Sequence, residues 1–194
     1  MNEGHLELLA SPAWHAYLET ELLPWFLEHA VLDGDVLEIG PGPGLMTELL
    51  RRHASRLVAV EIDPVLAAAL AERLAGTGVE VLCSDARATG LGGGRFTTAT
   101  CATMLHHVPS ADAQDALFAE AFRLLRRGGK LIGVDSVDDP ELRAFHADDV
   151  FVPVDPVTLG SRLEAAGFAS VTVEAWTATT RTGPKVRFVA TKES

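Results

Sequence analysis

A loop of alternating glycines and prolines is the stretch of this chain whose residue types best suit the binding of a ligand. It lies in the sequence VLEIGPGPG at residues 36–44, after an apolar run typical of a buried strand. Glycine accepts positive φ angles and places no side chain between backbone and ligand, whereas proline stiffens the turn. The loop residues are Gly40, Pro41, Gly42, Pro43 and Gly44. A strand, a glycine loop and a helix that opens directly afterwards predict a nucleotide-binding crevice.

The spacing of the glycines indicates which nucleotide the loop suits. The dinucleotide pattern G-x-G-x-x-G would need glycine at position 45, which is Leu45, and the Lys and Ser/Thr of a phosphate-binding P-loop are also missing. Glu38 stands before the first glycine, within the apolar run, where an unpaired charge would be unfavourable. The resulting pattern E-x-G-x-G-x-G resembles motif I of the class I S-adenosylmethionine (SAM) dependent methyltransferases. The other interpretation is a plain strand-to-helix turn.

Later positions match the cofactor-binding motifs of that family. Glu61 ends the next apolar run, and the resemblance implies that its carboxylate accepts hydrogen bonds from both ribose hydroxyls; capping a helix is its alternative role. Asp85 and Ala86 resemble the adenine-binding turn, in which the carboxylate accepts from the exocyclic amine. The cofactor-binding residues that the resemblance implies are Glu38, Gly40, Pro41, Gly42, Gly44, Glu61, Ile62, Asp85, Ala86 and Thr103.

Three further motifs narrow the resemblance to the small-molecule branch called type 11 methyltransferases. They are TMLHHVPS at residues 103–110, LLRRGGKL at 124–131 and LEAAGF at 163–168. Residues 36–85 are as similar to the ribosomal RNA adenine dimethyltransferases, which place an Asn-Leu-Pro-aromatic motif after the fourth strand to grip a flipped base. This chain has Met104-Leu105-His106-His107 there, and we expect it to lack the basic C-terminal domain of that family. The resemblance therefore implies a small-molecule acceptor and no nucleic-acid partner.

Histidines supply the candidate bases for such a reaction. Methyl transfer from a sulfonium is an in-line displacement, so the protein mainly binds, aligns and desolvates its two partners. A hydroxyl acceptor also benefits from a base near neutral pH, for which histidine is suited. We favour His106 and His146 over His107 and His15, with structural packing as the alternative for each. Methylation of nitrogen or carbon stays open, as does a SAM-binding sensor or partner subunit without catalytic activity.

Acidic residues raise the question of a metal. Asp135, Asp148 and Asp149 could join a histidine to bind Mg²⁺, as in metal-assisted O-methyltransferases. Acid-rich loops are usually only solvated, so we expect no metal site.

Alternating patterns along the chain indicate the elements that position these residues. Strands are expected at residues 36–39, 57–62, 79–83, 96–103 and 130–135, with helices at 65–75 and 111–127 among the connections. This alternation predicts a mostly parallel sheet with helices on both faces. Residues 138–153 are expected to be irregular and 156–167 helical, while 171–176 and 185–190 alternate like a hairpin with its turn at 181–184. The whole resembles the Rossmann-like seven-stranded methyltransferase fold, an α/β fold with an antiparallel C-terminal hairpin.

Length and charge limit the remaining possibilities. A chain of 194 residues suits one domain, placed at 1–194. Residues 1–30 are expected to be helical, interrupted by Pro24, and to form a partial lid over the acceptor pocket, a helix pair packed on the sheet, or both. The net charge of −11 and the absence of a basic run argue against a nucleic-acid partner. The sequence shows neither a signal peptide nor an apolar run long enough to cross a bilayer, so we expect a cytoplasmic protein without membrane insertion. Cys83 and Cys101 are expected to be buried thiols.

Overall fold

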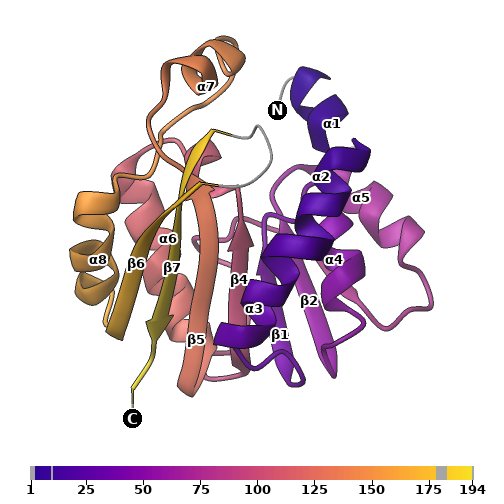
Figure 1. The fold of residues 1–194 in the computed structure, drawn as a ribbon. Helices are drawn as coiled ribbons and strands as arrows, with labels where there is room; N and C mark the ends of the chain where they lie inside the picture. The colour runs from indigo at the N-terminus through magenta and orange to yellow at the C-terminus, as the bar shows by residue number, and fades with distance from the viewer. Residues whose placement is uncertain (1–2, 10, 178–182, 194) are drawn as a thin grey trace.

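Seven strands form a single sheet through the middle of the molecule (Figure 1). The computed structural model describes residues 3–9, 11–177 and 183–193. The strands are β1 (Asp35–Ile39), β2 (Arg56–Glu61), β3 (Glu80–Cys83), β4 (Phe96–Ala102), β5 (Leu125–Ser136), β6 (Ala169–Thr177) and β7 (Pro184–Thr191). Their order is β3-β2-β1-β4-β5-β7-β6, and every neighbouring pair is parallel except the two that include β7. This confirms the predicted Rossmann-like sheet with an antiparallel C-terminal pair.

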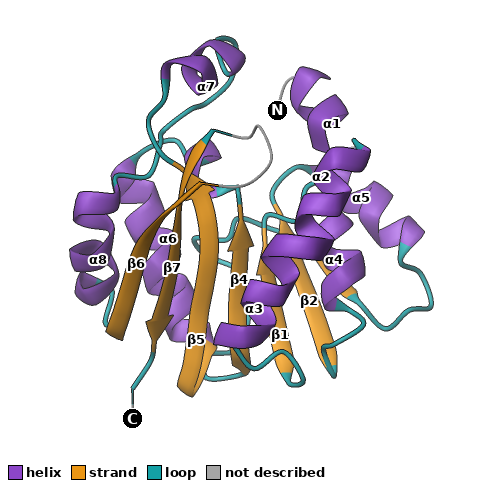
Figure 2. Cartoon of the chain, in the orientation of Figure 1, coloured by secondary structure: helices purple, strands orange, loops and turns teal. Residues whose placement is uncertain are grey.

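Helices cover both faces of the sheet (Figure 2). They are α1 (Glu3–Leu9), α2 (Pro12–Tyr17), α3 (Leu23–His29), α4 (Leu45–Leu50), α5 (Pro64–Arg73), α6 (Ala111–Leu124), α7 (Pro140–Phe145) and α8 (Pro156–Ala165), with a π-helical turn η1 (Leu18–Leu22) and a 3₁₀ turn η2 (Leu105–His107). Successive strand residues face opposite layers: Val36 packs with the N-terminal helices, whereas Leu37 and Ile39 pack with α6 and α8. Burial on both faces explains why the strands read as continuous apolar runs.

Residues 12–29 form a continuous helical layer on one face of the sheet. Tyr17, Leu22 and Phe26 are buried against the sheet. The sequence predicted a break at Pro24, but the helix continues there, because the wide turn η1 leads from α2 directly into α3. In this π turn the Leu23 N–H donates to the Leu18 carbonyl, and proline, which has no N–H to donate, follows at once.

Two predicted boundaries differ in the structure. Helix α6 ends at Leu124, not at 127, and β5 begins at Leu125, because Leu125 already pairs with Phe96 of β4. The register then shifts, so that Lys130 pairs with Thr98 beyond a bulge that contains the two glycines of the turn. The segment 138–153 was expected to be irregular, but it contains α7, whose first turn Asp139 caps by accepting from two backbone N–H groups.

One side-chain prediction was wrong, and another lies partly outside the described residues. Cys101 is buried as expected, whereas Cys83 is exposed, because β3 is an edge strand with a partner on one side only. The hairpin turn was placed at residues 181–184, of which 181 and 182 lie outside the described part of the chain. In that part, no helix is both long and apolar enough to cross a membrane.

Candidate active site

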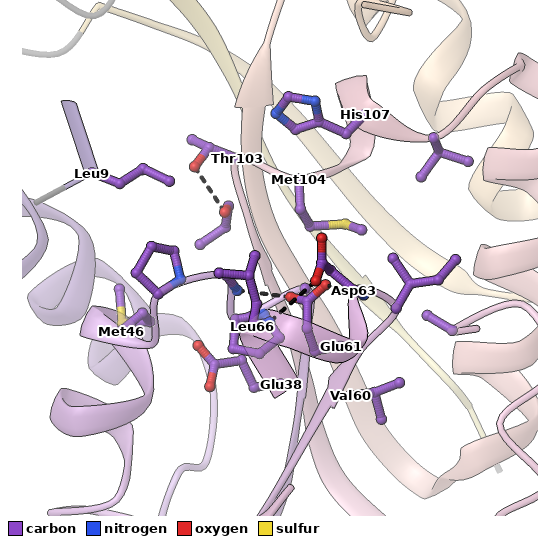
Figure 3. Close-up of a pocket in the computed structure, with 18 of the residues that line it drawn as sticks. Leu9, Glu38, Met46, Val60, Glu61, Asp63, Leu66, Thr103, Met104 and His107 are labelled. Carbon is purple, nitrogen blue, oxygen red and sulfur yellow. Dashed lines mark hydrogen bonds between the residues drawn. The ribbon is translucent and has the colours of Figure 1, made fainter. Parts of the chain in front are cut away.

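A cavity of about 300 Å³ opens where β1, β2 and β4 end (Figure 3). Its walls combine the glycine loop, the ends of these strands and the N-terminal helices, which contribute Leu9, Trp14 and Leu18. The carboxyl edge of a parallel sheet is the usual ligand site of this architecture. The predicted lid therefore contributes directly to the cavity wall, although closure over an acceptor stays a prediction.

The glycine loop has the backbone that the sequence predicted. Gly40, Gly42 and Gly44 have φ angles of 67°, 53° and 81°, in the region that favours glycine. A Cβ atom added to Gly40 would lie 2.9 Å from the side chain of Met104, which follows β4. The loop thus passes too close to the end of β4 to carry a side chain at that point.

Glu61 holds this loop in place. One carboxylate oxygen, Oε2, accepts from the Gly42 N–H at 2.9 Å, and the other, Oε1, accepts from the Asp63 N–H at 2.9 Å. Asp63 itself caps α5 by accepting from Val65 and Leu66, so Glu61 is not the helix cap. Each carboxylate oxygen can accept more than one hydrogen bond. The ribose role of Glu61 stays a prediction, and the structure adds a second role in shaping the loop.

Glu38 is a buried acid on the cavity wall. Burial raises its pKa to about 7, the nearby Thr47 hydroxyl opposes part of the rise, and the negative charge of Glu61 adds to it. Among the described residues, none donates a hydrogen bond to its Oε2 atom. A buried acceptor without a donor suits a ligand that brings positive charge, as SAM does with its sulfonium and its amino group.

The end of β3 supplies the predicted adenine turn. Asp85 and Ala86 line the cavity, and Ile62, also predicted, lines it from the end of β2. Asp85 is paired with Arg87, whose Nε lies 2.9 Å from both carboxylate oxygens. These hydrogen bonds lower the pKa of Asp85 below its ordinary value. The carboxylate therefore stays ionised, and an adenine amine would share it with Arg87, a cavity residue that the sequence reading did not include.

Thr103 marks the turn out of β4 toward the histidines. It lines the cavity and has a φ angle of 52°, which is strained for a β-branched residue. Its N–H donates to Val134 on β5 at 2.7 Å, which fixes the strained backbone. Such strain gathers at functional sites, where the surrounding structure can maintain it.

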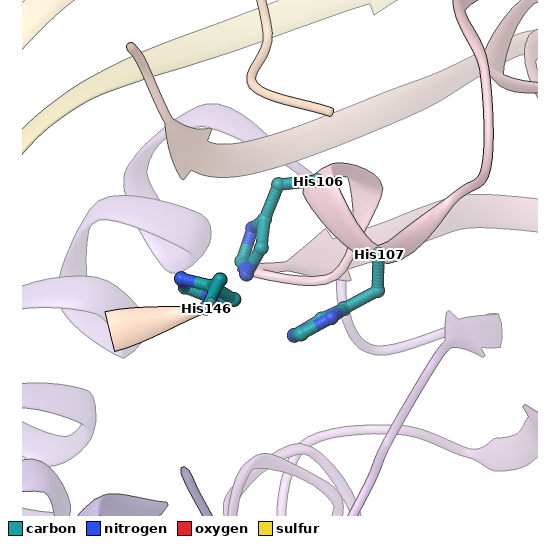
Figure 4. Close-up of side chains that lie close together, drawn as sticks. All are labelled: His106, His107 and His146. Atoms are coloured by element: carbon teal, nitrogen blue, oxygen red, sulfur yellow. The ribbon is translucent and has the colours of Figure 1, made fainter. Parts of the chain in front are cut away.

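Three histidines meet next to this turn (Figure 4). His106 and His107 belong to η2, and His146 follows α7; the ring centroids of His106 lie 4.2 Å from His107 and 5.1 Å from His146. Only His107 is among the cavity-lining residues, whereas His106 and His146 are 2% and 4% exposed. Burial lowers the pKa of His146. The two bases favoured from the sequence, His106 and His146, are buried next to His107, which the sequence reading ranked lower but which lines the cavity.

Asp135 anchors the cluster from the end of β5. Its Oδ1 atom lies 2.6 Å from His106 Nδ1 and accepts from the Ser136 N–H, and its Oδ2 accepts from the Leu105 N–H. Burial alone would raise the pKa of Asp135, but His106 and the backbone N–H groups hold it below its ordinary value. The carboxylate is fully buried and occupied by these donors, which leaves it unsuited to the Mg²⁺ role considered from the sequence. Asp148, also considered, is exposed, and Asp149 lines the cavity beside His107.

The sequence did not predict that His146 lies next to His106 and His107. The adjacent histidines were a visible signal, but their partner comes from a segment read as irregular loop. Leu9, Leu18 and Leu66 also line the cavity without a motif that marks them, because apolar wall residues carry no signal beyond general hydrophobicity.

Comparison with known proteins identifies the family. The family described as "Methyltransferase domain" matches residues 37–133, half of the chain. Ribosomal RNA small subunit methyltransferase A of Koribacter versatilis is 50% identical over 56 residues, which make up 28% of this chain and 20% of that protein. The chain thus spans about a fifth of the length of such curated relatives.

Solved structures show the same fold. The 1,6-didemethyltoxoflavin-N1-methyltransferase of Burkholderia thailandensis has a TM-score of 0.73 at 22% identity, covering 99% of this chain and 83% of that chain. Phosphoethanolamine N-methyltransferase 2 of Haemonchus contortus, solved with SAM, has a TM-score of 0.74 at 15% identity, covering 93% and 53%. The glycine loop, the sheet order and the family match agree. The chain belongs to the methyltransferase-domain family, whose methyl donor is S-adenosylmethionine.

Proposed function

We propose that this chain transfers a methyl group from SAM to a hydroxyl oxygen of a small molecule. The observation that carries the proposal is a single cavity with two chemically different ends. Glu38 and Glu61 place carboxylates at one end, and His107, with Asp149 beside it, places an imidazole at the other (Figure 3); Asp85 also lines the cavity. The first end suits a cationic nucleoside, and the second suits an acceptor that must lose a proton.

At the carboxylate end, the chain's own groups match the parts of SAM, which supplies a methyl group on a positively charged sulfur. Glu61 and the loop that it braces would bind the ribose, and Asp85 would accept from the adenine amine. Glu38 would lie near the cationic methionine part, which offsets the unfavourable burial of the carboxylate.

At the imidazole end, apolar side chains exclude water from the reacting groups. Leu9, Trp14, Val108 and Pro109 line this cavity together with His107. A cavity of about 300 Å³ is within the range of small-molecule sites. The net charge of −11 adds repulsion against a polynucleotide backbone. These features support a small acceptor over RNA, although short stretches of the chain are similar to ribosomal RNA methyltransferases.

His107 is the side chain placed to receive the acceptor's proton. His106 packs against it, and Asp135 fixes the His106 ring through the 2.6 Å contact to Nδ1. In catalytic triads a buried carboxylate orients the base directly through a hydrogen bond; here Asp135 fixes His106, and His106 supports the His107 ring by packing. His106 and His146, predicted as bases from the sequence, act in this proposal as positioning residues behind His107.

The test is a set of acceptors that differ in the atom methylated. The protein would be incubated with SAM labelled in its methyl group and with phenols, alcohols, amines, carbon acids and a short RNA hairpin, and products would be located by mass spectrometry and NMR. The proposal expects an O-methyl product that His107→Gln reduces. Product on nitrogen, carbon or RNA would contradict the hydroxyl assignment, and SAM binding without any product would favour a sensor.

A further inference from the structure

The histidine cluster has the composition and arrangement of a metal-binding site. One ring nitrogen from each of His106, His107 and His146 lies within 4.8 Å of the other two (Figure 4). The rings come from two segments, η2 and the residue after α7, which the fold brings together beside the cavity. We propose that these three imidazoles bind one divalent transition-metal ion.

The groups behind the rings orient the histidines for this role. His106 Nδ1 lies 2.6 Å from Asp135 Oδ1, and His146 Nδ1 lies 2.7 Å from the Leu142 carbonyl oxygen. A carbonyl and an ionised carboxylate only accept hydrogen bonds, so Nδ1 carries a proton in both rings, and in the neutral ring Nε2 keeps the lone pair. Metal-binding histidines in proteins have the same support, with the second ring nitrogen donating to a carboxylate or carbonyl. His107 has a comparable neighbour, Asp149 Oδ2, 3.9 Å from its Nδ1.

The ligand type decides which ions fit. Imidazole suits zinc, nickel, cobalt and copper, whereas Mg²⁺ and Ca²⁺ prefer oxygen ligands. In a tetrahedral zinc site with Zn–N bonds of about 2.0–2.1 Å, the nitrogens lie about 3.3 Å apart. The nitrogens must therefore approach one another by at most about 1.5 Å, the difference from the 4.8 Å limit. Helix α7 itself has no buried residue, so the main packing that such a shift must preserve or replace is that of the buried His146 ring on Phe151.

An ion in this position would adjoin the acceptor end of the cavity. Three imidazoles leave a coordination position open, and an oxygen of the acceptor is a ligand that the position would take. This consequence rests on the proposed function, because it needs an acceptor to be bound beside His107. With the ion bound, the lone pair of His107 is engaged, and the ion would instead ease the loss of the hydroxyl proton by lowering the pKa of the bound acceptor. His107 acts as the base in the metal-free protein. The binding of the ion depends only on the cluster.

Aromatic packing is the competing explanation for the cluster. His146 stacks on Phe151 at 4.4 Å between centroids, and His106 meets the same ring edge-on at 5.7 Å. Packing of this kind needs rings of the right shape but no lone pairs. It therefore predicts no ion binding.

The experiment uses the full chain, without a histidine tag, freed of metal by chelator dialysis. Zn²⁺ would be titrated by calorimetry, and Co²⁺ would be followed by its visible absorption, which reports coordination geometry. We expect one ion per chain, and we expect His107→Gln and His146→Gln each to weaken binding at least tenfold, the lower bound for losing even a supporting group of a metal site. The matched control is His53→Gln, an exposed histidine outside the cluster, which should bind like the wild type.

Circular dichroism of the metal-free variants separates lost binding from lost folding. His106 is almost completely buried, so His106→Gln can fail to fold. His107 is partly exposed, and His107→Gln then serves as the variant that tests metal binding. Absence of saturable binding in the folded wild type, or equal weakening by His53→Gln, would overturn the proposal. Ion binding without methyl transfer would support the metal site and contradict the proposed function. Methyl transfer by a protein that binds no ion would support the proposed function and contradict the metal site.

Discussion

The two ends of the cavity are built in different ways. At the cofactor end, the backbone determines the shape of the site. Three glycines with positive φ angles form the loop, and Glu61 holds it by accepting a hydrogen bond from the Gly42 N–H. At the acceptor end, side chains from η2, α7 and the N-terminal helices meet in space. A backbone-built site tolerates few residue types, whereas a site built from side chains can change its chemistry by substitution on a constant frame. We therefore expect changes at the cofactor end to alter SAM affinity and changes at the acceptor end to alter turnover.

The largest effect should come from His107. Replacing it with Gln removes the imidazole that lines the acceptor end. We expect kcat to fall by about 10²–10⁴, the usual contribution of general-base catalysis, while the Kd for SAM stays within about twofold of the wild-type value. Steady-state kinetics with calorimetry would measure both quantities. His15→Gln, which changes an exposed histidine paired with Glu19, is the matched control. A variant that loses SAM affinity but keeps its kcat would show that the two ends are not separate.

Glu38 should make the stability of the protein depend on pH. Its pKa is about 7 in the folded protein against 4.5 as the ordinary value, so the folded state holds a proton that the unfolded chain releases. The contribution is fully present below about pH 4.5 and is lost as the pH rises through 7. We expect stability to fall by about 2–3 kcal/mol from pH 5 to pH 8 through this group, and Glu38→Gln to remove that part. Urea unfolding at both pH values measures it; an unchanged pH dependence in the variant would contradict the assignment.

Glu61 tests the bracing of the loop. Glu61→Ala leaves the Gly42 and Asp63 N–H groups without their acceptor and removes the predicted ribose ligand. We expect SAM binding to weaken by about 1.5–3 kcal/mol, the scale of hydrogen bonds to a charged group. Glu61→Gln keeps one acceptor oxygen and should fall between the wild type and the alanine variant. Calorimetry on both variants decides, and full affinity in a folded alanine variant would remove Glu61 from the cofactor site.

The contrast between the two ends also explains what the sequence could predict. The glycine loop, Glu61 and Asp85 lie at the ends of successive strands, so a local pattern locates each of them and the parallel sheet brings them together. The sheet could be predicted for a related reason, because apolar runs that alternate with helical patterns are compatible with only a few fold architectures.

The acceptor end was less accessible because its contacts are not local. His146 reaches the histidine pair only through the path of α7, and that helix has six residues and no buried face to produce a periodic pattern. Which histidine lines the cavity depends on the exact turn of η2, and spacing in sequence does not determine that. Cys83 was misjudged in the same way, because edge position in a sheet is a property of the whole topology.

The smallest effect should come from Thr103, where the two ends meet. Its φ angle of 52° is unfavourable for a β-branched residue by about 1–2 kcal/mol, and glycine adopts it without strain. The Thr103 hydroxyl bonds only to the adjacent Ala102 carbonyl among the described contacts, so its loss removes little. We expect Thr103→Gly to raise the free energy of unfolding by up to about 1 kcal/mol, because glycine's greater freedom in the unfolded chain offsets part of the gain. Thr103→Val, which keeps the branched shape without the hydroxyl, is the control and should bring no gain. If the strain positions Met104 and the histidines, the more stable glycine variant should turn over more slowly, whereas equal gains in both variants would show that the backbone of Thr103 is not strained.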